Sequence, residues 1–236
     1  MSSSNLEILA YEKTPLGDLC LRRRELLSRP GTVITEITLD LQLLMSSYIT
    51  VSERALADEA ISRHSGVELS VLVGGLGLGY TAAQVLQSER VERVEVIELF
   101  PAVVGFMQQG LVPLSAELLE DPRFGVRQGD VYRTLREEAD ERWDLVLIDV
   151  DHAPEDHLGA GNESFYTESG LTQAKNHLAP GGILAVWSYA ESSPFVDALR
   201  ASFEIVDVVP VRYINDLVDE EHTDWLFVAK DAPASA

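Results

Sequence analysis

The chain has 236 residues, 46% of them hydrophobic, which suits one α/β domain with a small addition. Its formal net charge of −21 argues against nucleic acid as a partner, because phosphate binding requires basic patches, whereas the same charge favours a cationic substrate. The single cysteine, Cys20, excludes an internal disulfide and a CxxC metal site.

Two further absences bear on location. The sequence has no run of eighteen apolar residues, so we expect no membrane-spanning helix and no membrane partner. The first residues, MSSSNLEILAYEKT, have neither a basic n-region nor an apolar h-region, so no secretory signal is visible. We therefore expect a cytoplasmic protein, in which the acidic surface also aids solubility.

Residues 1–50 are predicted to form a small N-terminal β region, a β-hairpin appendage. Short apolar stretches at 7–11 and 19–21 flank a turn. Residues 33–39 alternate as a strand, and residues 41–45 are a candidate for the returning strand. Ser52 is then a candidate N-cap for a helix that extends to Gly66. We place the second domain at residues 51–236.

Residues 69–99, LSVLVGGLGLGYTAAQVLQSERVERVEVIEL, carry the main motif. An apolar strand is followed by a glycine cluster, a helical pattern and a second apolar strand that ends in an acid. Glycine lets the backbone approach a ligand closely, and the helix start offers free N–H groups. A carboxylate at the end of the second strand suits ribose hydroxyls. The motif predicts a nucleoside site, the alternative being a tight turn without a ligand; its residues are Gly74, Gly75, Gly77, Gly79 and Glu98.

The rest of the chain alternates strands and helices. Helical patterns are predicted at 81–87, 101–109, 111–119, 131–139, 165–178 and 194–202. Strands are predicted at 71–73, 94–97, 124–127, 143–148, 183–187, 203–211 and 224–229, with a long acidic loop at 215–222. This order predicts an α/β fold: a doubly wound, Rossmann-like, seven-stranded and mostly parallel sheet.

Four acids follow predicted strands, and such sheets bind ligands at the carboxyl ends of their strands. Glu98 suits the ribose. Asp130 suits the adenine amino group, and the backbone N–H of Val131 is available to a ring nitrogen. Asp149 and Asp151 would face the reactive end of the ligand.

Several segments together resemble the polyamine synthases, and more broadly the class I S-adenosylmethionine-dependent transferases. They are VLVGGLGLGYT, VEVIEL, QGDVYRTL, WDLVLIDVDHAP and FYTESGLTQAKNHLAPGGILAVW. The resemblance to spermidine synthases covers the chain from about residue 33 onward. It implies a polyamine-biosynthesis enzyme that transfers an aminopropyl or other alkyl group from S-adenosylmethionine or its decarboxylated form to an amine. In that family order Glu98 holds ribose, Asp130 holds adenine and Asp149 is the base on the attacking amine, and the family often forms homodimers.

The sequence departs from the family at two places. Gly77 stands where spermidine synthases carry an aspartate that holds the donor's amine, and Asp149-Val150-Asp151-His152-Ala153-Pro154 replaces the usual D-S/T-S/T-D-P. Two alternatives therefore stay open: a methyltransferase that uses S-adenosylmethionine, and a non-catalytic nucleoside-binding homologue.

His152 is a second candidate base, because an unperturbed histidine titrates near working pH. His152 and His157, with Asp149 and Asp151, would have the ligand types of a mixed nitrogen and oxygen metal site. Polar loops of this kind are more often lids, so we expect no metal. The catalytic candidates are Asp149, Asp151 and His152.

Overall fold

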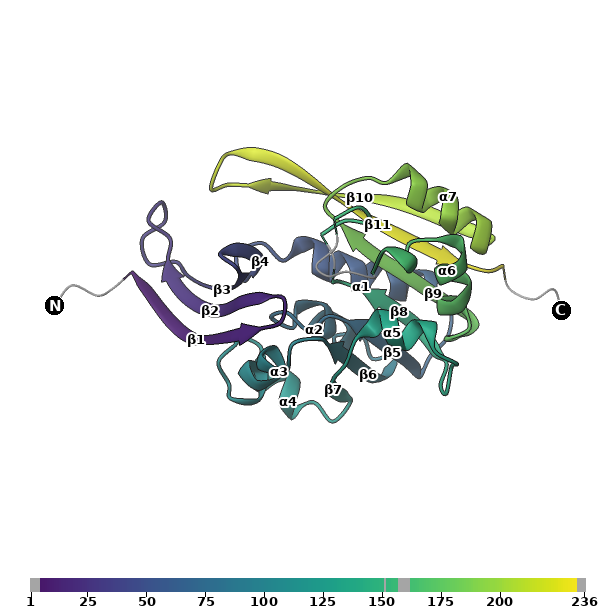
Figure 1. Cartoon of the computed structure of the whole chain (residues 1–236), viewed down its shortest axis with the longest axis horizontal. Helices are drawn as coiled ribbons and strands as arrows, with labels where there is room; N and C mark the ends of the chain where they lie inside the picture. Colours follow the sequence, from purple (N-terminus) through teal and green to yellow (C-terminus); the bar gives the residue numbers. More distant parts are fainter. Residues whose placement is uncertain (1–4, 151, 157–161, 233–236) are drawn as a thin grey trace.

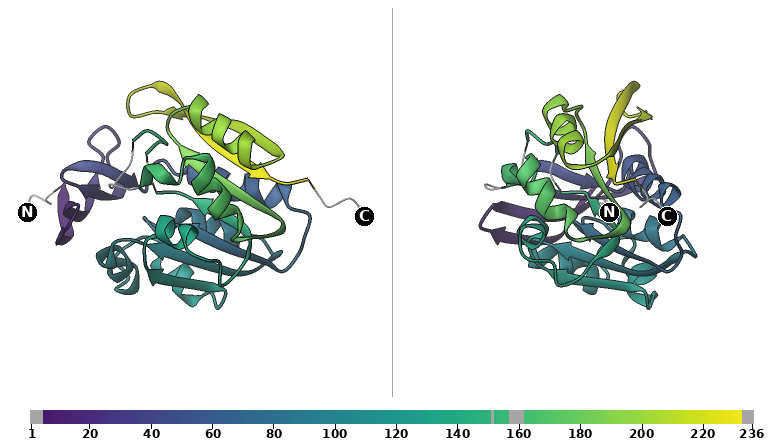
Figure 2. Two further views of the ribbon diagram at one scale, coloured as in Figure 1. Left: turned by 45° about the vertical axis from the view of Figure 1, so that its right-hand side comes forward. Right: turned by 90° about the vertical axis from the view of Figure 1, so that its right-hand side faces the viewer.

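The computed structural model describes residues 5–150, 152–156 and 162–232. They form a four-stranded sheet and a seven-stranded sheet with helices (Figure 1). The smaller sheet stands at one end of the larger unit, as the left view of Figure 2 shows. None of the helices in this part of the chain has the length and apolarity that crossing a bilayer requires.

The N-terminal sheet is larger than the predicted hairpin. Its four strands lie in sequence order and pair antiparallel, so two hairpins share one sheet. The central pair buries Leu19 and Leu21 of one strand and Ile37 of the other, which a lone hairpin could not do. The strands are β1 (Leu6–Thr14), β2 (Gly17–Glu25), β3 (Val33–Leu39) and β4 (Gln42–Ser46).

The large sheet confirms the predicted α/β class. Its strand order is β10-β11-β9-β8-β5-β6-β7, and the five strands from β9 to β7 are mutually parallel. β11 is antiparallel to both of its neighbours. The bounds are β5 (Leu69–Gly74), β6 (Val91–Glu98), β7 (Phe124–Gln128), β8 (Trp143–Ile148), β9 (Leu178–Ser188), β10 (Ile205–Asn215) and β11 (Glu220–Lys230).

Helices cover both faces of this sheet. In β5, Val71 and Val73 pack in one apolar cluster while Leu72 packs in the other, as expected for a strand buried on both faces. The first face carries α1 (Val51–Arg63), α2 (Tyr80–Leu86), α3 (Pro101–Gln108) and α4 (Ser115–Glu120). The second carries α5 (Val131–Arg136), α6 (Glu168–Lys175) and α7 (Ser193–Ser202).

Three local predictions were wrong. Ser52 is not the N-cap of α1: Thr50 precedes the helix, and the Ser52 hydroxyl donates instead to Asp224 Oδ2 at 2.5 Å. Helix α6 is shorter than predicted because Thr167 caps it by accepting from Gly170 N–H. The predicted acidic loop is shorter than expected: Asn215 still pairs with Glu220, so residues 216–219 separate β10 from β11.

The tip of the β10–β11 hairpin reaches the N-terminal sheet (Figure 1). Asp216 accepts a hydrogen bond from the Tyr48 hydroxyl at 2.5 Å and pairs with Arg29. Near the glycine loop, Met45 Sδ of β4 accepts from Leu78 N–H at 2.8 Å. These contacts and a shared apolar cluster hold the small sheet beside the carboxyl ends of the parallel strands.

Candidate functional site

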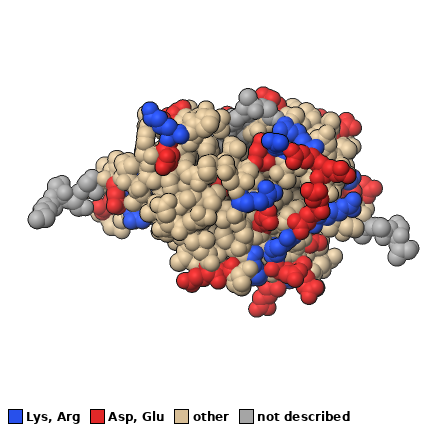
Figure 3. Space-filling model, turned by 60° about the horizontal axis from the view of Figure 1, so that its bottom comes forward, with Lys and Arg blue, Asp and Glu red and all other residues tan. Residues whose placement is uncertain are grey.

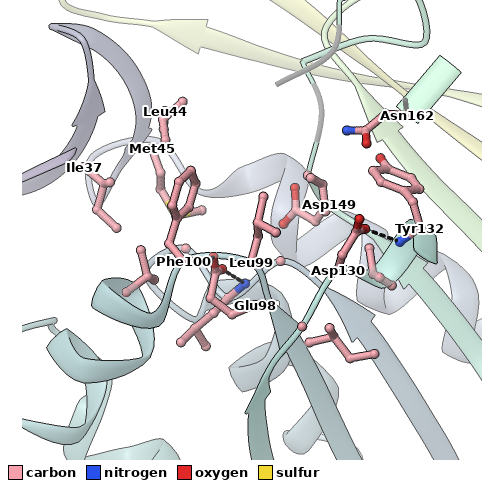
Figure 4. Close-up of a pocket in the computed structure, with 18 of the residues that line it drawn as sticks. Ile37, Leu44, Met45, Glu98, Leu99, Phe100, Asp130, Tyr132, Asp149 and Asn162 are labelled. Carbon is pink, nitrogen blue, oxygen red and sulfur yellow. Dashed lines mark hydrogen bonds between the residues drawn. The ribbon is translucent and has the colours of Figure 1, made fainter. Parts of the chain in front are cut away.

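A cavity of about 240 Å³ lies where the carboxyl ends of β5, β6 and β8 meet the N-terminal sheet. Its walls come from the glycine loop, from the residues after these strands, from α1 and from β3 and β4 (Figure 4). Apolar side chains of the small sheet, including Ile37, Leu44 and Met45, form one side. No lysine or arginine is among the described residues that line it.

The glycine loop contributes Gly75 and Gly77 to the cavity wall. Both have positive φ, +91° and +50°, which a side chain would strain. A Cβ on Gly75 would also overlap the backbone oxygen of Asp149. Gly74 and Gly79 were predicted beside them but do not line the cavity: Gly74 packs against Val131 and Ile148, and Gly79 precedes α2 and packs against Leu118.

Glu98 ends β6 and is 6% exposed. Its Oε2 accepts from Leu76 N–H at 2.8 Å and its Oε1 from Phe100 N–H at 2.7 Å. Burial raises the pKa of Glu98, and these backbone bonds oppose the rise. The carboxylate therefore ties the glycine loop to the end of β6 and still lines the cavity (Figure 4).

Asp130 is the N-cap of α5. Its Oδ1 accepts from Tyr132 N–H at 2.9 Å (Figure 4) and from Arg133 N–H at 3.1 Å. Both bonds use one oxygen, which leaves Oδ2 for a ligand. Val131 also lines the cavity as the first residue of the helix, where a backbone N–H has no intrahelical partner.

Asp149 follows β8 and lines the cavity. Its Oδ2 accepts from the Thr81 hydroxyl at 2.6 Å. Burial, and then the charge of Asp224, raise the pKa of Asp149 to about 6, against the effect of the Thr81 bond. The group is thus a carboxylate at neutral pH that can accept a proton at modest cost.

Glu53, on the first turn of α1, also lines the cavity, and the sequence patterns did not single it out. Burial raises its pKa to about 8, and the charges of Asp149 and Asp224 add to the rise. Asp224 is 7% exposed and accepts from Ser52, and from Trp187 Nε1 at 3.3 Å. Three carboxylates from α1, β8 and β11 therefore influence one another electrostatically.

Of the remaining predicted site residues, one lines the cavity and two cannot be placed. His152 lines the cavity, with its Nδ1 3.8 Å from Asp156 Oδ2. Asp151 and His157 lie outside the described residues. Within the described ranges, no group of three or more histidine, cysteine or acidic side chains has the arrangement of a metal site.

Solved structures share this architecture. A spermidine synthase in complex with the transition state analogue AdoDATO matches with a TM-score of 0.74 and 18% identity, over 95% of this chain and 74% of that one. The spermidine synthase from Thermotoga maritima matches with a TM-score of 0.72 and 17% identity, over 95% and 72%. At these identities the likeness establishes the fold.

Curated relatives match over part of their length. A polyamine aminopropyltransferase from Oceanobacillus iheyensis is 30% identical over 119 residues, which are 50% of this chain and 22% of the relative. Polyamine aminopropyltransferase 2 from Streptomyces coelicolor is 31% identical over 144 residues, 60% of this chain and 24% of the relative. The match thus spans less than a quarter of either relative.

The family model for the spermine/spermidine synthase domain matches residues 51–200, from the start of α1 into α7. That range contains the glycine loop and the acids after β6, β7 and β8, so the match covers the part of the chain that builds most of the cavity. The resemblance seen in the sequence motifs is confirmed: the chain belongs to the spermine/spermidine synthase domain family.

Proposed function

We propose that the cavity binds an S-adenosyl sulfonium donor and that the protein transfers an alkyl group, the aminopropyl group in the first instance, to an amine. One observation carries the proposal: Glu98, Asp130 and Asp149, at the carboxyl ends of β6, β7 and β8 in one parallel sheet, line one cavity with the glycine loop. The aminopropyl group is the one in the names of the curated relatives.

The nucleoside would lie along the ends of β6 and β7. Glu98 accepts from the backbone on both sides of the cavity edge, and its carboxylate also lines the cavity, so we place the ribose hydroxyls against it. Asp130 Oδ2 would accept from the adenine amino group, and the N–H of Val131 would donate to a ring nitrogen. The backbone at Gly75 and Gly77 would then pass close to the ribose and sulfur.

The chemistry is an in-line displacement at the carbon attached to sulfur. The nitrogen lone pair of the amine forms the new N–C bond, the C–S bond breaks, and its electrons neutralise the sulfonium to a thioether. The attacking amine must be neutral, so a proton leaves it, and Asp149 would accept that proton and orient the lone pair. His152, also in the wall, would pass the proton to solvent. Asp151 is a further candidate from its position in the sequence.

We predict that Asp149→Asn keeps nucleoside binding but loses nearly all transfer. The amide can still accept from Thr81 but cannot take a proton, so the loss falls on the transition state. The measurement pairs methylthioadenosine calorimetry with transfer assays on putrescine, spermidine and other amines, using S-adenosylmethionine and its decarboxylated form. Full activity in Asp149→Asn would show that Asp149 is not the proton acceptor.

A second candidate is methyl transfer from S-adenosylmethionine. It is favoured by Gly77, which offers no side chain to an ammonium group and is covered by Met45. The two-donor assay separates the candidates. Nucleoside binding without transfer to any amine from either donor would instead favour a non-catalytic nucleoside-binding module.

Three further properties belong to the same proposal. We propose that residues 1–50 and 51–236 act as the substrate-covering region and the nucleoside-binding domain, that the protein works in the cytoplasm, and that it is a homodimer. Light scattering at micromolar concentration tests the oligomeric state. The negative net charge supports a small cationic substrate over nucleic acid.

A further inference from the structure

Two features of the cavity have no role in the proposed mechanism: Met45 of β4, which covers the glycine loop, and Glu53 of α1. We infer that Glu53 holds the ammonium end of the donor's sulfur-linked group, and that Met45 keeps the loop side of the cavity apolar. The inference rests on the proposed nucleoside site, because Glu98 and Asp130 would fix where the sulfur lies.

The loop side is closed to a charged group. Met45 Sδ would lie 2.5 Å from a Cβ on Gly77, so the thioether already occupies the space that a side chain at position 77 would take. The same sulfur accepts from Leu78 N–H. Ile37 and Leu44 continue this wall with apolar atoms (Figure 4). An ammonium there would lose its water without gaining a partner, and burying an unpaired charge is strongly unfavourable.

The other carboxylates of the described cavity wall already have a part in the proposed function. Glu98, whose oxygens also accept backbone N–H groups, is assigned to the ribose, and Asp130, which caps α5, is assigned to the adenine amino group. Asp149 accepts from Thr81 and is assigned to the attacking amine. The attacking amine and the amine of the donor's aminopropyl group would occupy the cavity together. The second of them therefore requires a carboxylate in addition to Asp149.

Glu53 differs from these three carboxylates because no other described residue donates a hydrogen bond to it; its own backbone N–H is its one donor within that part of the chain. The neighbouring Arg54 is directed elsewhere. Its Nε donates to Thr50, its Nη1 donates to Gln84 at 3.0 Å, and its guanidinium lies over the Tyr80 ring. A ligand ammonium at Glu53 would supply the missing opposite charge.

The test compares two thioethers without the sulfonium charge, of which only the second carries an ammonium group: 5′-deoxy-5′-(propylthio)adenosine and 5′-deoxy-5′-(3-aminopropylthio)adenosine. Calorimetry on the full chain should show that the wild type binds the amino compound at least about tenfold more tightly, the lower range for a hydrogen bond to a charged partner. Glu53→Gln should bring the two dissociation constants together while leaving the propyl compound unaffected.

Matched variants separate this effect from general changes in charge or folding. Asp58→Asn removes the same charge from the exposed side of α1 and should keep the preference. Met45→Glu in the Glu53→Gln background places a carboxylate against the loop and should restore the preference, whereas Met45→Leu in the wild-type background keeps this wall apolar and should keep the preference. A thermal melt checks that each variant is folded.

Equal affinities in the wild type, or a preference that survives Glu53→Gln, would overturn the assignment of Glu53 while leaving the nucleoside site in place. Failure of Met45→Glu to restore the preference would overturn the role of Met45. If the wild type binds neither compound, the proposed function fails and this inference fails with it.

Discussion

Glu98 joins two roles at the scale of one residue. It accepts backbone N–H groups from the glycine loop and from the turn after β6, and it lines the cavity where we place the ribose. Its removal would therefore leave donors of the protein and of the ligand unpaired.

We predict that Glu98→Ala weakens methylthioadenosine binding by about 1–3 kcal/mol, the usual cost of unpaired buried donors. The matched control is Glu95→Ala on the same strand, whose carboxylate pairs with Arg127 at the surface. Calorimetry compares the two. An unchanged dissociation constant in Glu98→Ala would remove this carboxylate from the ligand site.

Glu53 and Asp149 make stability depend on pH. Their pKa values are raised from 4.5 to about 8 and from 3.8 to about 6, so the folded protein binds these protons more tightly than the unfolded chain. Their contribution is complete below pH 4 and is lost as pH rises to about 8. Asp224 adds to the repulsion at both groups, whereas Arg54 weakly opposes it at Glu53.

We predict that Glu53→Gln is more stable than the wild type at pH 9 by about 1–2 kcal/mol, or roughly 2–8 °C in melting temperature, because glutamine cannot acquire the buried charge. The difference should disappear near pH 4.5, where the wild-type glutamate is protonated in the folded state. Melting curves of the ligand-free proteins across this range test it. Parallel curves at every pH would contradict the raised pKa.

At the scale of elements, the strand β5, the glycine loop and α2 act as one unit. Gly75 donates its N–H to Ile97 O at 2.9 Å and lies directly against the backbone of Asp149. The loop thus fixes the spacing between the ends of β5, β6 and β8, on which the cavity depends.

We predict that Gly75→Ala destabilises the protein by about 2 kcal/mol more than Gly110→Ala and abolishes nucleoside binding. Both glycines have positive φ, +91° and +74°, so the backbone strain of about 1–2 kcal/mol is shared. A methyl group at position 110 meets no atom within 4 Å, whereas one at 75 overlaps backbone. Urea unfolding with ligand titration measures both effects, and equal stability losses would show that the close approach is unimportant.

For the whole molecule, the negative charge and the two-part architecture set how a substrate arrives. On the face shown in Figure 3, acidic side chains gather over one half and are interspersed with lysine and arginine. The cavity lies between the two sheets and has no lysine or arginine in its described wall. The summed field therefore favours entry of a cationic amine.

We predict that raising the salt concentration from about 0.05 to about 0.5 M increases the KM for a polyamine several-fold, because the Debye length falls from over 10 Å to under 5 Å. Methylthioadenosine is neutral, and its dissociation constant should change little over the same range. A KM that is independent of salt would mean that the net charge does not guide the substrate.

Local patterns in the sequence determined the class of fold and one edge of the site. The strand, glycine loop, helix, strand and acid of residues 69–99 are neighbours in the chain, and their geometry follows from backbone sterics and from apolar periodicity. The positions of Glu98, Asp130 and Asp149 after successive strands follow in the same way, because parallel strands bring their carboxyl ends together.

Contacts between distant segments were decided by the tertiary structure. Met45 and Leu78 are 33 residues apart, and Ser52 and Asp224 are 172 apart. A helical pattern gives the position of Glu53 on α1 but not its neighbours across the cavity, so the sequence predicted Ser52 as a cap and gave Glu53 no role. Their roles emerge only when β8 and β11 place Asp149 and Asp224 nearby, because burial and charge repulsion depend on the packed surroundings.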